Sequence, residues 1–330
     1  MKKRIIQWTQ PLLKRVGLRL AREKDYQQTQ KLNALLRRLI NHAKTSSKTD
    51  SDSITFCIFS KDRALQLDGL LRSMLCHIQG SYSIQVIYSA SNDQHARAYQ
   101  EAAEELKRPD LIQWTQENNF SDDLIQQLKA IQTEFVCFLV DDIVFIRPID
   151  LDALDRPKIR KGIVSLRLGR NIDYCYTKQK TMQLPDLRPA NDSNDLLQFD
   201  WTRGTYDWAY PLSVDGHIFL TSEIQITVEH LNFRAPNSFE RALQILTPLY
   251  QARAGYCFAS PIILNIPLNR VQGENDNISG TITPEYLLQK WQSGQRLHFE
   301  QLADIHTQSV HEEVEISFIE RVHPPQATDE

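Results

Sequence analysis

The 330-residue chain has no pair of cysteines at Cys-x-x-Cys spacing. Of its five cysteines, Cys57, Cys137 and Cys257 lie inside apolar, strand-like runs. Cysteines in such runs behave as small buried hydrophobic residues in a reducing compartment. The spacing therefore argues against a disulfide framework and against a zinc site.

Long apolar runs are also missing. No stretch approaches the roughly 20 apolar residues of a membrane-spanning helix. The basic N-terminus is not followed by the apolar segment of a secretory signal, so we expect a cytoplasmic protein. A strong excess of positive charge is absent too, because the formal net charge is −3. This balance argues against a general nucleic-acid binder.

The positive charge that is present gathers in residues 1–45, where lysine and arginine greatly outnumber Glu23 and Asp25. Leucine and isoleucine recur there at helical spacing, which predicts a helical arm. A basic amphipathic arm can lie peripherally on an anionic membrane surface, or it can pack on its own domain or on a partner subunit. The Ser/Thr/Lys/Asp-rich stretch 45–53 reads as a linker, so we treat residues 1–50 as an arm and linker.

After the linker, short apolar runs alternate with amphipathic segments. Strands are expected at residues 54–59, 84–88, 111–114 and 135–140, and helices at residues 65–77, 93–107 and 121–131. Strands that alternate with helices form right-handed crossovers and a mostly parallel sheet with helices on both faces. The pattern thus predicts an α/β, Rossmann-like fold.

Three polar clusters follow the strands of this half, namely Ser60–Arg63, residues 89–93, and the pair Asp141 and Asp142. Ligands of parallel sheets sit beyond the carboxyl ends of the strands, where these clusters would meet. Paired carboxylates at a sheet edge are costly unless a cation neutralises them. Oxygen ligation suits Mg²⁺ or Mn²⁺, which are often shared with a phosphate. The alternative is a solvated acidic turn.

The second half is less regular. We expect strands at residues 163–168, 173–181 and 255–264, and helices at residues 222–230 and 238–250. The stretch after Val310 is acidic and contains proline, so we expect it to fray. We find no internal repeat.

On two features, a first strand followed by Ser60-Lys-Asp-Arg63 and a fourth strand ending in Asp141-Asp142, the chain resembles the GT-A glycosyltransferases. The resemblance covers residues 51–275, and it departs from a strict Asp-x-Asp motif because Val140 precedes the pair. It implies a donor-nucleotide half at 51–150, an acceptor half at 151–275, and C-terminal helices with an acidic tail at 276–330. A binding protein that keeps the fold without turnover is the alternative.

The resemblance also implies a reaction. A metal-dependent, hexosyltransferase-like enzyme would move a sugar from a nucleoside-diphosphate sugar, with UDP expected, to a hydroxyl of a glycan or lipid-linked glycan. Mn²⁺ or Mg²⁺ would be held by Asp142 and Asp141. The implied donor-binding residues are Ser60, Lys61, Asp62, Arg63, Asn92, Asp93, Asp141, Asn269, Arg270 and Gln272. Asn92 and Asp93 can equally begin a helix, and the other loops can be plain surface.

An inverting transferase needs one general base, and Glu240 and Asp215 are the candidates, with Glu240 preferred. Glu240 can also be a helix-start acid or a capping partner of Asn237. Aromatic and imidazole side chains could contact the acceptor or sugar, while burial in the core is the competing interpretation. This acceptor set is Trp201, Trp208, Tyr210 and His217.

Overall fold

The computed structural model describes residues 29–30, 32–39, 41, 53–190, 195–269 and 282–321. The chain divides into one compact unit made of residues 1–48 and 226–230, and a second made of residues 49–225 and 231–330. In the first unit the described part of the arm is helical. Its Leu35 and Leu39 are buried, and Arg38 pairs with Glu229. Residues 1–28 of the expected arm lie outside the described part.

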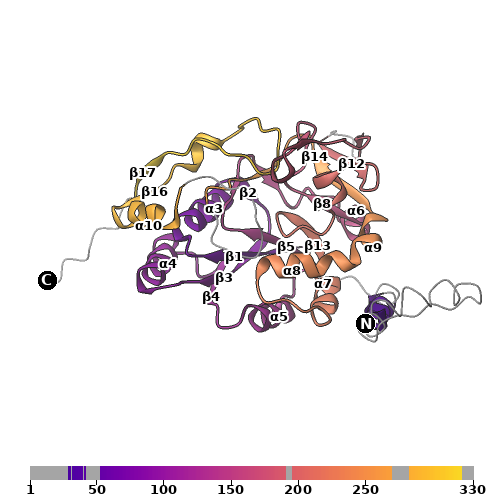
Figure 1. Ribbon diagram of the computed structural model, residues 1–330, viewed down its shortest axis with the longest axis horizontal. Coiled ribbons are helices and arrows are strands. Elements are labelled where there is room, and N and C mark those ends of the chain that lie inside the picture. Colours follow the sequence, from indigo (N-terminus) through magenta and orange to yellow (C-terminus); the bar gives the residue numbers. More distant parts are fainter. Residues whose placement is uncertain are drawn as a thin grey trace, which may run out of the picture. The chain divides into compact units, whose positions relative to one another are not determined.

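The second unit is built on a nine-stranded sheet (Figure 1). Its strands are β1 (Ile54–Lys61), β3 (Tyr82–Ser89), β4 (Ile112–Gln116), β5 (Phe135–Val140), β8 (Gly162–Ser165), β11 (Arg188–Pro189), β12 (Leu196–Asp200), β13 (His217–Leu220) and β14 (Ala254–Phe258). The spatial order is β11-β12-β14-β8-β13-β5-β1-β3-β4. The four strands expected between residues 54 and 140 are therefore confirmed.

Most strands of this sheet run in one direction. Strands β4, β3, β1 and β5 pair in parallel, as do β8 and β14. Strand β13 lies antiparallel between β5 and β8, and β12 runs antiparallel to β14 and β11. The expected α/β fold with a mostly parallel central sheet is thus present, and the reversed strand β13 joins its two parallel parts.

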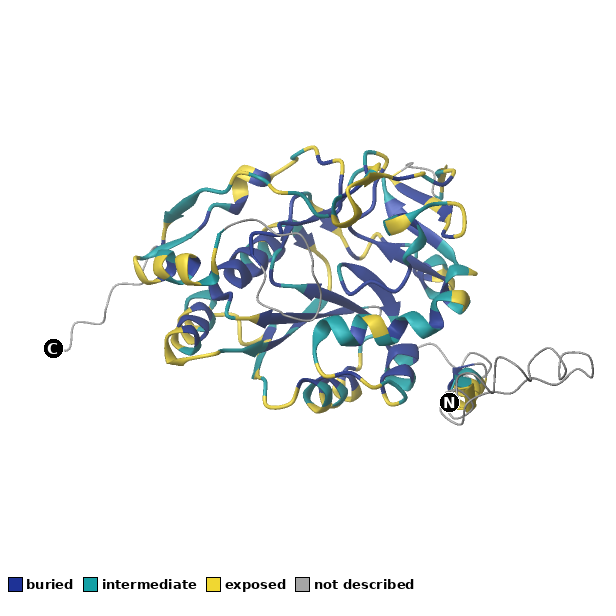
Figure 2. Cartoon of the chain, in the orientation of Figure 1, coloured by how far each residue is buried: buried dark blue, intermediate teal, exposed yellow. Residues whose placement is uncertain are grey.

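Helices cover both faces of the parallel half. On one face, Ile54, Phe56 and Ile58 of β1 join the core formed by Leu67 and Leu70 of α3 (Ala64–His77) together with α4 (Asp93–Leu106). The residues of β1 that alternate with these three point to the opposite face of the sheet, because successive side chains of a strand face opposite sides. The central strands β1 and β5 are accordingly buried along most of their length, as Figure 2 shows.

The opposite face carries an aromatic layer. Phe59 of β1 packs against Phe120 of α5 (Phe120–Ala130), and Phe138 of β5 packs against Phe239 of α8 (Pro236–Leu243). Strand β13 leads on this side directly into α7 (Thr221–Val228). Helices from both halves of the second unit therefore cover this face of the sheet.

The structure corrects several expected elements of the second half. The segment 238–250 is not one helix but α8, a 3₁₀ turn and α9 (Thr247–Gln251), since Pro248 cannot donate a helical hydrogen bond. Pro261 likewise divides 255–264 into β14 and β15 (Ile263–Asn265). The expected strand at 173–181 is only the short hairpin of β9 (Tyr174–Cys175) and β10 (Lys180–Thr181).

Short elements complete the second unit. They are β2 (Ile78–Gln79), β6 (Ile143–Phe145), β7 (Ile149–Asp150), α6 (Arg156–Lys161) and the 3₁₀ turns η1 (Tyr176–Lys178), η2 (Tyr206–Ala209) and η3 (Gln244–Leu246). Strand β6 pairs with β15, and β2 pairs with β7. Among the described residues, no helix has the length and apolar character needed to cross a membrane.

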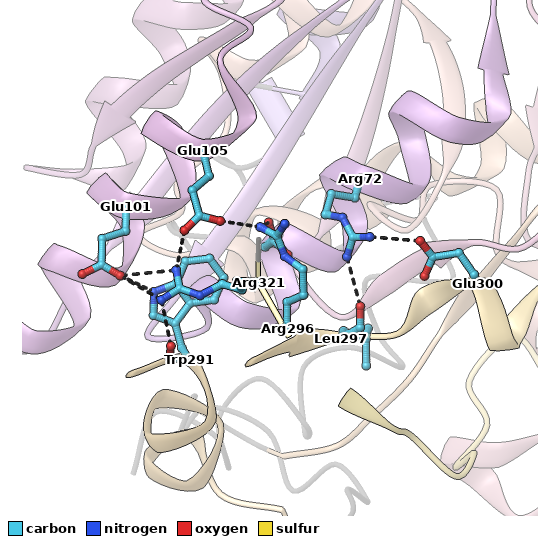
Figure 3. Close-up of polar contacts among 9 residues, drawn as sticks. Arg72, Glu101, Glu105, Trp291, Arg296, Leu297, Glu300 and Arg321 are labelled. Carbon is cyan, nitrogen blue, oxygen red and sulfur yellow. Dashed lines mark hydrogen bonds and ion pairs between the residues drawn. The ribbon is translucent and has the colours of Figure 1, made fainter. Parts of the chain in front are cut away.

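The C-terminal part differs from the expected helices and frayed tail. Its described residues, 282–321, form one helix, α10 (Pro284–Gln292), the 3₁₀ turn η4 (Phe299–Leu302), and a hairpin of β16 (Gln295–Leu297) with β17 (Phe318–Glu320). This part is bound to α3 and α4 by charged side chains, here called the clasp, of which Figure 3 labels Glu101, Glu105, Arg296 and Arg321. The clasp consists of Asp68, Glu101, Glu105, Arg296 and Arg321.

Within the clasp, Arg296 contacts Asp68 at 2.9 Å and Glu105 at 2.7 Å, and Arg321 contacts Glu105 at 2.8 Å. The Arg321 guanidinium also lies 3.8 Å from the centre of the Trp291 ring. The Asp68 side chain is fully buried, and this burial raises its pKa to about 6 against the opposing charge of Arg296. Acids and arginines far apart in sequence are thus brought into one network, in which Asp68, Glu105, Arg296 and Arg321 are largely buried.

We expect Arg296→Ala to lower the free energy of unfolding by about 3–5 kcal/mol, because it leaves the buried Asp68 charge without its partner. Chemical denaturation of the variant measures this loss. The double variant Asp68→Leu with Arg296→Met removes both charges and should lose clearly less stability. A double variant as unstable as the single one would contradict the assignment of the loss to an uncompensated charge.

Candidate functional site

The candidate site lies where the order of strands reverses. From β1 the chain moves outward through β3 and β4, and then returns to β5 on the other side of β1. Such a switch point leaves a crevice at the carboxyl ends of the two central strands. Ser60–Arg63 follow β1, and Asp141 and Asp142 follow β5. Of the three polar clusters that the sequence assigned to one edge, these two are in contact through Arg63 and Asp141.

The carboxylate of Asp141 is fully engaged by protein donors. Its Oδ2 accepts hydrogen bonds from the Ser60 hydroxyl at 2.8 Å and the Lys61 backbone N–H at 3.2 Å. Its Oδ1 accepts from the Arg63 guanidinium at 2.8 Å. Asp141 is also buried. This residue therefore ties the ends of β1 and β5 together.

Asp142 is held less tightly and is more open. Its Oδ2 accepts from Arg63 at 3.1 Å and its Oδ1 from the Asn265 amide at 3.0 Å, while 13% of the side chain is exposed. Burial raises the pKa of Asp142 to about 6, with Arg63 opposing the shift and Asp141 adding to it. An acid whose negative charge is costly in this way gains from an added cation.

A divalent cation fits this position by the chemistry of the oxygen atoms. Within the described ranges, no cluster of three or more His, Cys, Asp or Glu side chains could hold a metal. Asn265, however, is buried, and its amide oxygen has no hydrogen-bond partner, while its amide nitrogen contacts Asp142. A carboxylate beside an unused amide oxygen is a donor set suited to Mg²⁺ or Mn²⁺.

The loop after β1 is bound to the loop after β3. Asp62 adopts a left-handed backbone conformation with φ of 56°, which is uncommon for a non-glycine residue. Its carboxylate accepts hydrogen bonds from the Ser91 backbone N–H at 2.7 Å and the Ser91 hydroxyl at 2.5 Å. Asn92 caps α4 by accepting from the backbone of Gln94 and His95, and Asp93 is the first residue of that helix. These contacts show that Asn92 caps the helix, which is the alternative interpretation for that residue.

The donor residues predicted after β15 are only partly described. Asn269 is buried, and it accepts hydrogen bonds from Arg63 with its side-chain oxygen at 2.7 Å and its backbone oxygen at 2.5 Å. Arg63 therefore links Asn269 to both aspartates. Arg270 and Gln272 lie outside the described residues.

Both candidate bases belong to the second half of the chain, residues 151–275. Asp215 directly precedes Gly216, whose φ of 78° favours glycine and whose absent side chain leaves room for Ile263. Glu240 comes from the second turn of α8 and accepts from the Ser213 hydroxyl at 3.1 Å and the Val214 backbone N–H at 3.2 Å. The start of α8 is instead bound by Ser238, whose hydroxyl accepts from the Ala235 N–H, so Glu240 is not a capping partner of Asn237.

The two acids have different acidities. Burial raises the pKa of Glu240 to about 7, and the nearby Asp215 charge adds to this shift. Burial would raise the pKa of Asp215 too, but its hydrogen bond to His311 and the charges of His311 and Arg167 hold it below the ordinary value. Carboxyl groups whose pKa values are pushed apart are typical of sites that divide acid and base roles.

Two charged residues of this site were missed by the sequence analysis. Arg167, just after β8, is buried and contacts Asp207 at 3.1 Å and Asp215 at 3.5 Å. The His311 imidazole lies 3.3 Å from Asp215, and although burial lowers its pKa, Asp215 raises it above the ordinary value overall. The Arg167 guanidinium, together with His311 when it is protonated, lowers the pKa of Asp215 and so favours its negative charge.

His311 reaches the site through long-range backbone contacts. The Asn265 N–H donates to the Val310 carbonyl, and the Glu312 N–H donates to the Asn265 carbonyl, so this segment runs alongside β15. Tyr176 adds a hydrogen bond to Ser309. The expectation that the chain frays after Val310 is wrong for residues 311–321, because an acidic composition does not reveal a pairing with residues far away in sequence, and residues 322–330 lie outside the described part.

The predicted contact with the acceptor or sugar is wrong for three of the four residues in the acceptor set. Trp201 and Trp208 have no exposed surface, and the Trp208 indole donates to the Ile172 carbonyl at 2.8 Å. His217 is fully buried as well, contacts the Pro211 carbonyl at 3.0 Å, and has its pKa lowered to about 3 by burial. These three side chains belong to the core, and only Tyr210 is partly exposed.

Comparison with known proteins adds little. No protein-family model matches the sequence, and no curated protein matches it. Among solved structures, the chain is similar in part to a mannosyltransferase from Pyrobaculum calidifontis in complex with GDP-Man and Mn²⁺. The identity is 18% and the TM-score 0.28, and the match covers 44% of this chain and 46% of that one. The match spans less than half of that structure, and a likeness this partial says nothing about the chemistry of this chain.

Proposed function

We propose that the chain is a metal-dependent glycosyltransferase of the GT-A fold. It would transfer a sugar from a UDP-linked donor to a hydroxyl of a glycan or lipid-linked glycan, with inversion. The observation that carries the proposal is the presence of two carboxylate sites beside one sheet. Asp141 and Asp142 lie at the switch point, and Glu240 with Asp215 forms the second site. Residues 51–150 would bind the nucleotide and residues 151–275 the acceptor.

The donor would bind at the carboxyl ends of β1 and β5. Asp142 and Asn265 would hold Mn²⁺ or Mg²⁺, with Asp141 fixing the end of β5 against Arg63. When bound there, the cation would neutralise charge on the leaving diphosphate as a Lewis acid. The exposed Lys61 lies at the same edge and offers a further positive charge to a phosphate.

The acceptor hydroxyl would lose its proton to Glu240. A general base works best when its pKa lies near the operating pH, and the raised pKa of about 7 meets this condition. Asp215 would remain ionised beside Arg167 and His311, so its constant negative charge keeps the pKa of Glu240 high. The role of base therefore goes to Glu240 in this proposal.

A non-catalytic nucleotide-sugar or carbohydrate-binding protein is the second candidate. One observation favours it: the Arg63 guanidinium contacts both aspartates at 2.8 and 3.1 Å and already supplies a positive charge. A protein in which Arg63 serves in place of the metal could bind a nucleotide without promoting transfer.

Thermal unfolding with UDP, GDP and their sugar conjugates, each with Mn²⁺ or with EDTA, tests the proposal. A ligand present at 100 times its dissociation constant stabilises the native state by about 2.7 kcal/mol, so we expect a higher melting temperature with a UDP conjugate and Mn²⁺. Release of UDP from the stabilising donor then reports turnover. Stabilisation without release would favour the second candidate, and no stabilisation by any conjugate would contradict both.

A further inference from the structure

Tyr99 of α4 lies beneath the candidate cation site and was not predicted from the sequence. Its side chain is 1% exposed, and its hydroxyl oxygen accepts a hydrogen bond from the Arg63 backbone N–H at 3.0 Å. The same oxygen lies 2.6 Å from the Ser60 hydroxyl oxygen. The Ser60 hydroxyl in turn lies 2.8 Å from the Asp141 carboxylate.

The donor and the acceptor can be assigned in each of these three hydrogen bonds. The Asp141 carboxylate, paired with Arg63, can only accept, so Ser60 donates its single hydroxyl proton to Asp141. The remaining proton between Ser60 and Tyr99 must then come from Tyr99. The Tyr99 oxygen is thereby left to accept from the Arg63 backbone. We call this chain of groups, Arg63 N–H, Tyr99, Ser60 and Asp141, the tyrosine relay.

Arg63 belongs to both ends of the tyrosine relay, because its backbone contacts Tyr99 and its side chain contacts Asp141. The Arg63 backbone donates to Tyr99, while its guanidinium donates to Asp141 at 2.8 Å and Asp142 at 3.1 Å. One phenol hydroxyl thus fixes both the residue that bears the guanidinium and, through Ser60, the carboxylate beside Asp142. Groups that orient ligand side chains in this manner typically change metal affinity 10- to 100-fold when removed.

We propose that Tyr99 is a positioning residue of the cation site, acting through the tyrosine relay to orient Asp141 and Arg63 around Asp142. The inference rests on the proposed function, since it takes Asp142 as a residue that binds the cation. No contact between Tyr99 and the cation or the donor is involved.

The test removes the hydroxyl alone. We expect Tyr99→Phe to bind Mn²⁺ about 10- to 100-fold more weakly, as measured from the electron paramagnetic resonance signal of free Mn²⁺ without nucleotide. Measurement well below the melting temperature of each variant keeps the comparison to folded protein. Tyr256→Phe is the matched control, because it removes the hydroxyl of another buried tyrosine, on β14, and should bind Mn²⁺ as the wild type does.

A double-mutant cycle separates the relay from a general loss of stability. If Tyr99 and Ser60 act in one chain, Ser60→Ala should weaken Mn²⁺ binding similarly, and the double variant should bind no more weakly than the single ones. Unchanged Mn²⁺ affinity in folded Tyr99→Phe, or losses that simply add in the double variant, would overturn the relay alone. Absence of Mn²⁺ binding by the wild-type chain would instead contradict the proposed cation site, and the relay's role with it.

Discussion

Glu240→Gln is expected to lower kcat for sugar transfer by about 10²–10⁴-fold, the range that positioned proton transfer supplies. Glutamine keeps the shape of the side chain and can still contact the Ser213 hydroxyl and the Val214 N–H. It cannot accept a proton at neutral pH, however, so the loss should fall on kcat and leave the dissociation constant of the donor near that of the wild type. Steady-state kinetics together with direct measurement of donor binding separates the two quantities.

The pH dependence gives the same prediction a second readout. Because the base must be deprotonated, the wild-type rate should rise with pH and level off above a midpoint near 7, the pKa to which burial and Asp215 raise Glu240. The glutamine variant should lose this rise. The exposed Glu285, in the first turn of α10, provides the control variant Glu285→Gln, which should keep it. An unchanged pH profile in Glu240→Gln would assign the base elsewhere, with Asp215 the first alternative.

Asp142→Asn is expected to abolish cation-dependent nucleotide binding and to lower kcat by about 10²–10³-fold, the usual cost of removing one group that stabilises transition-state charge. Asparagine preserves the size of the side chain, and Asp141 still pairs with Arg63, so the fold should persist. Calorimetric titration of UDP with and without Mn²⁺ measures the binding. The circular dichroism spectrum of the variant should match that of the wild type.

The control for this prediction is Asp186→Asn, which changes an exposed carboxylate and should bind UDP and Mn²⁺ normally. The variant also tests the second candidate function. If Arg63 rather than a metal neutralises the phosphates, nucleotide binding will not depend on Mn²⁺ in the wild type and will survive in Asp142→Asn. Unchanged turnover in this variant would refute the assignment of Asp142 to the metal.

The parallel half of the fold was accessible from the sequence because its signals are local. The run Phe135–Val140 has the composition of a buried strand, and Asn92 is a typical helix cap, so each element can be located within a few residues. Parallel strands present their carboxyl ends at one edge of the sheet, and this rule predicted that Arg63 and Asp141 lie close together, as they do. Strand β13 was not predicted, because four residues between a turn and a helix show little hydrophobic periodicity.

The second carboxylate site, which we propose to bind the acceptor, could be predicted from the sequence only in part. Glu240 and Asp215 could be selected as carboxylates in the right half of the chain, but neither their burial nor their separate pKa values follow from the sequence. Tryptophan side chains such as Trp201 and Trp208 can either contact a sugar or pack in the core. Their complete burial shows that they belong to the core. The role of an aromatic side chain therefore depends on which elements cover it.

By itself, the sequence determined the alternation of strands and helices up to Asp142 and the edge at which the first polar clusters meet, because periodicity and strand direction act over short distances. Tertiary structure alone decided which charges face one another. Arg167 and His311 reach Asp215 from residues far along the chain, and Arg296 and Arg321 reach Asp68 and Glu105 in the same way. The physical reason is that an ion pair depends on separation in space and on burial, and neither quantity is recorded in the spacing of residues along a chain.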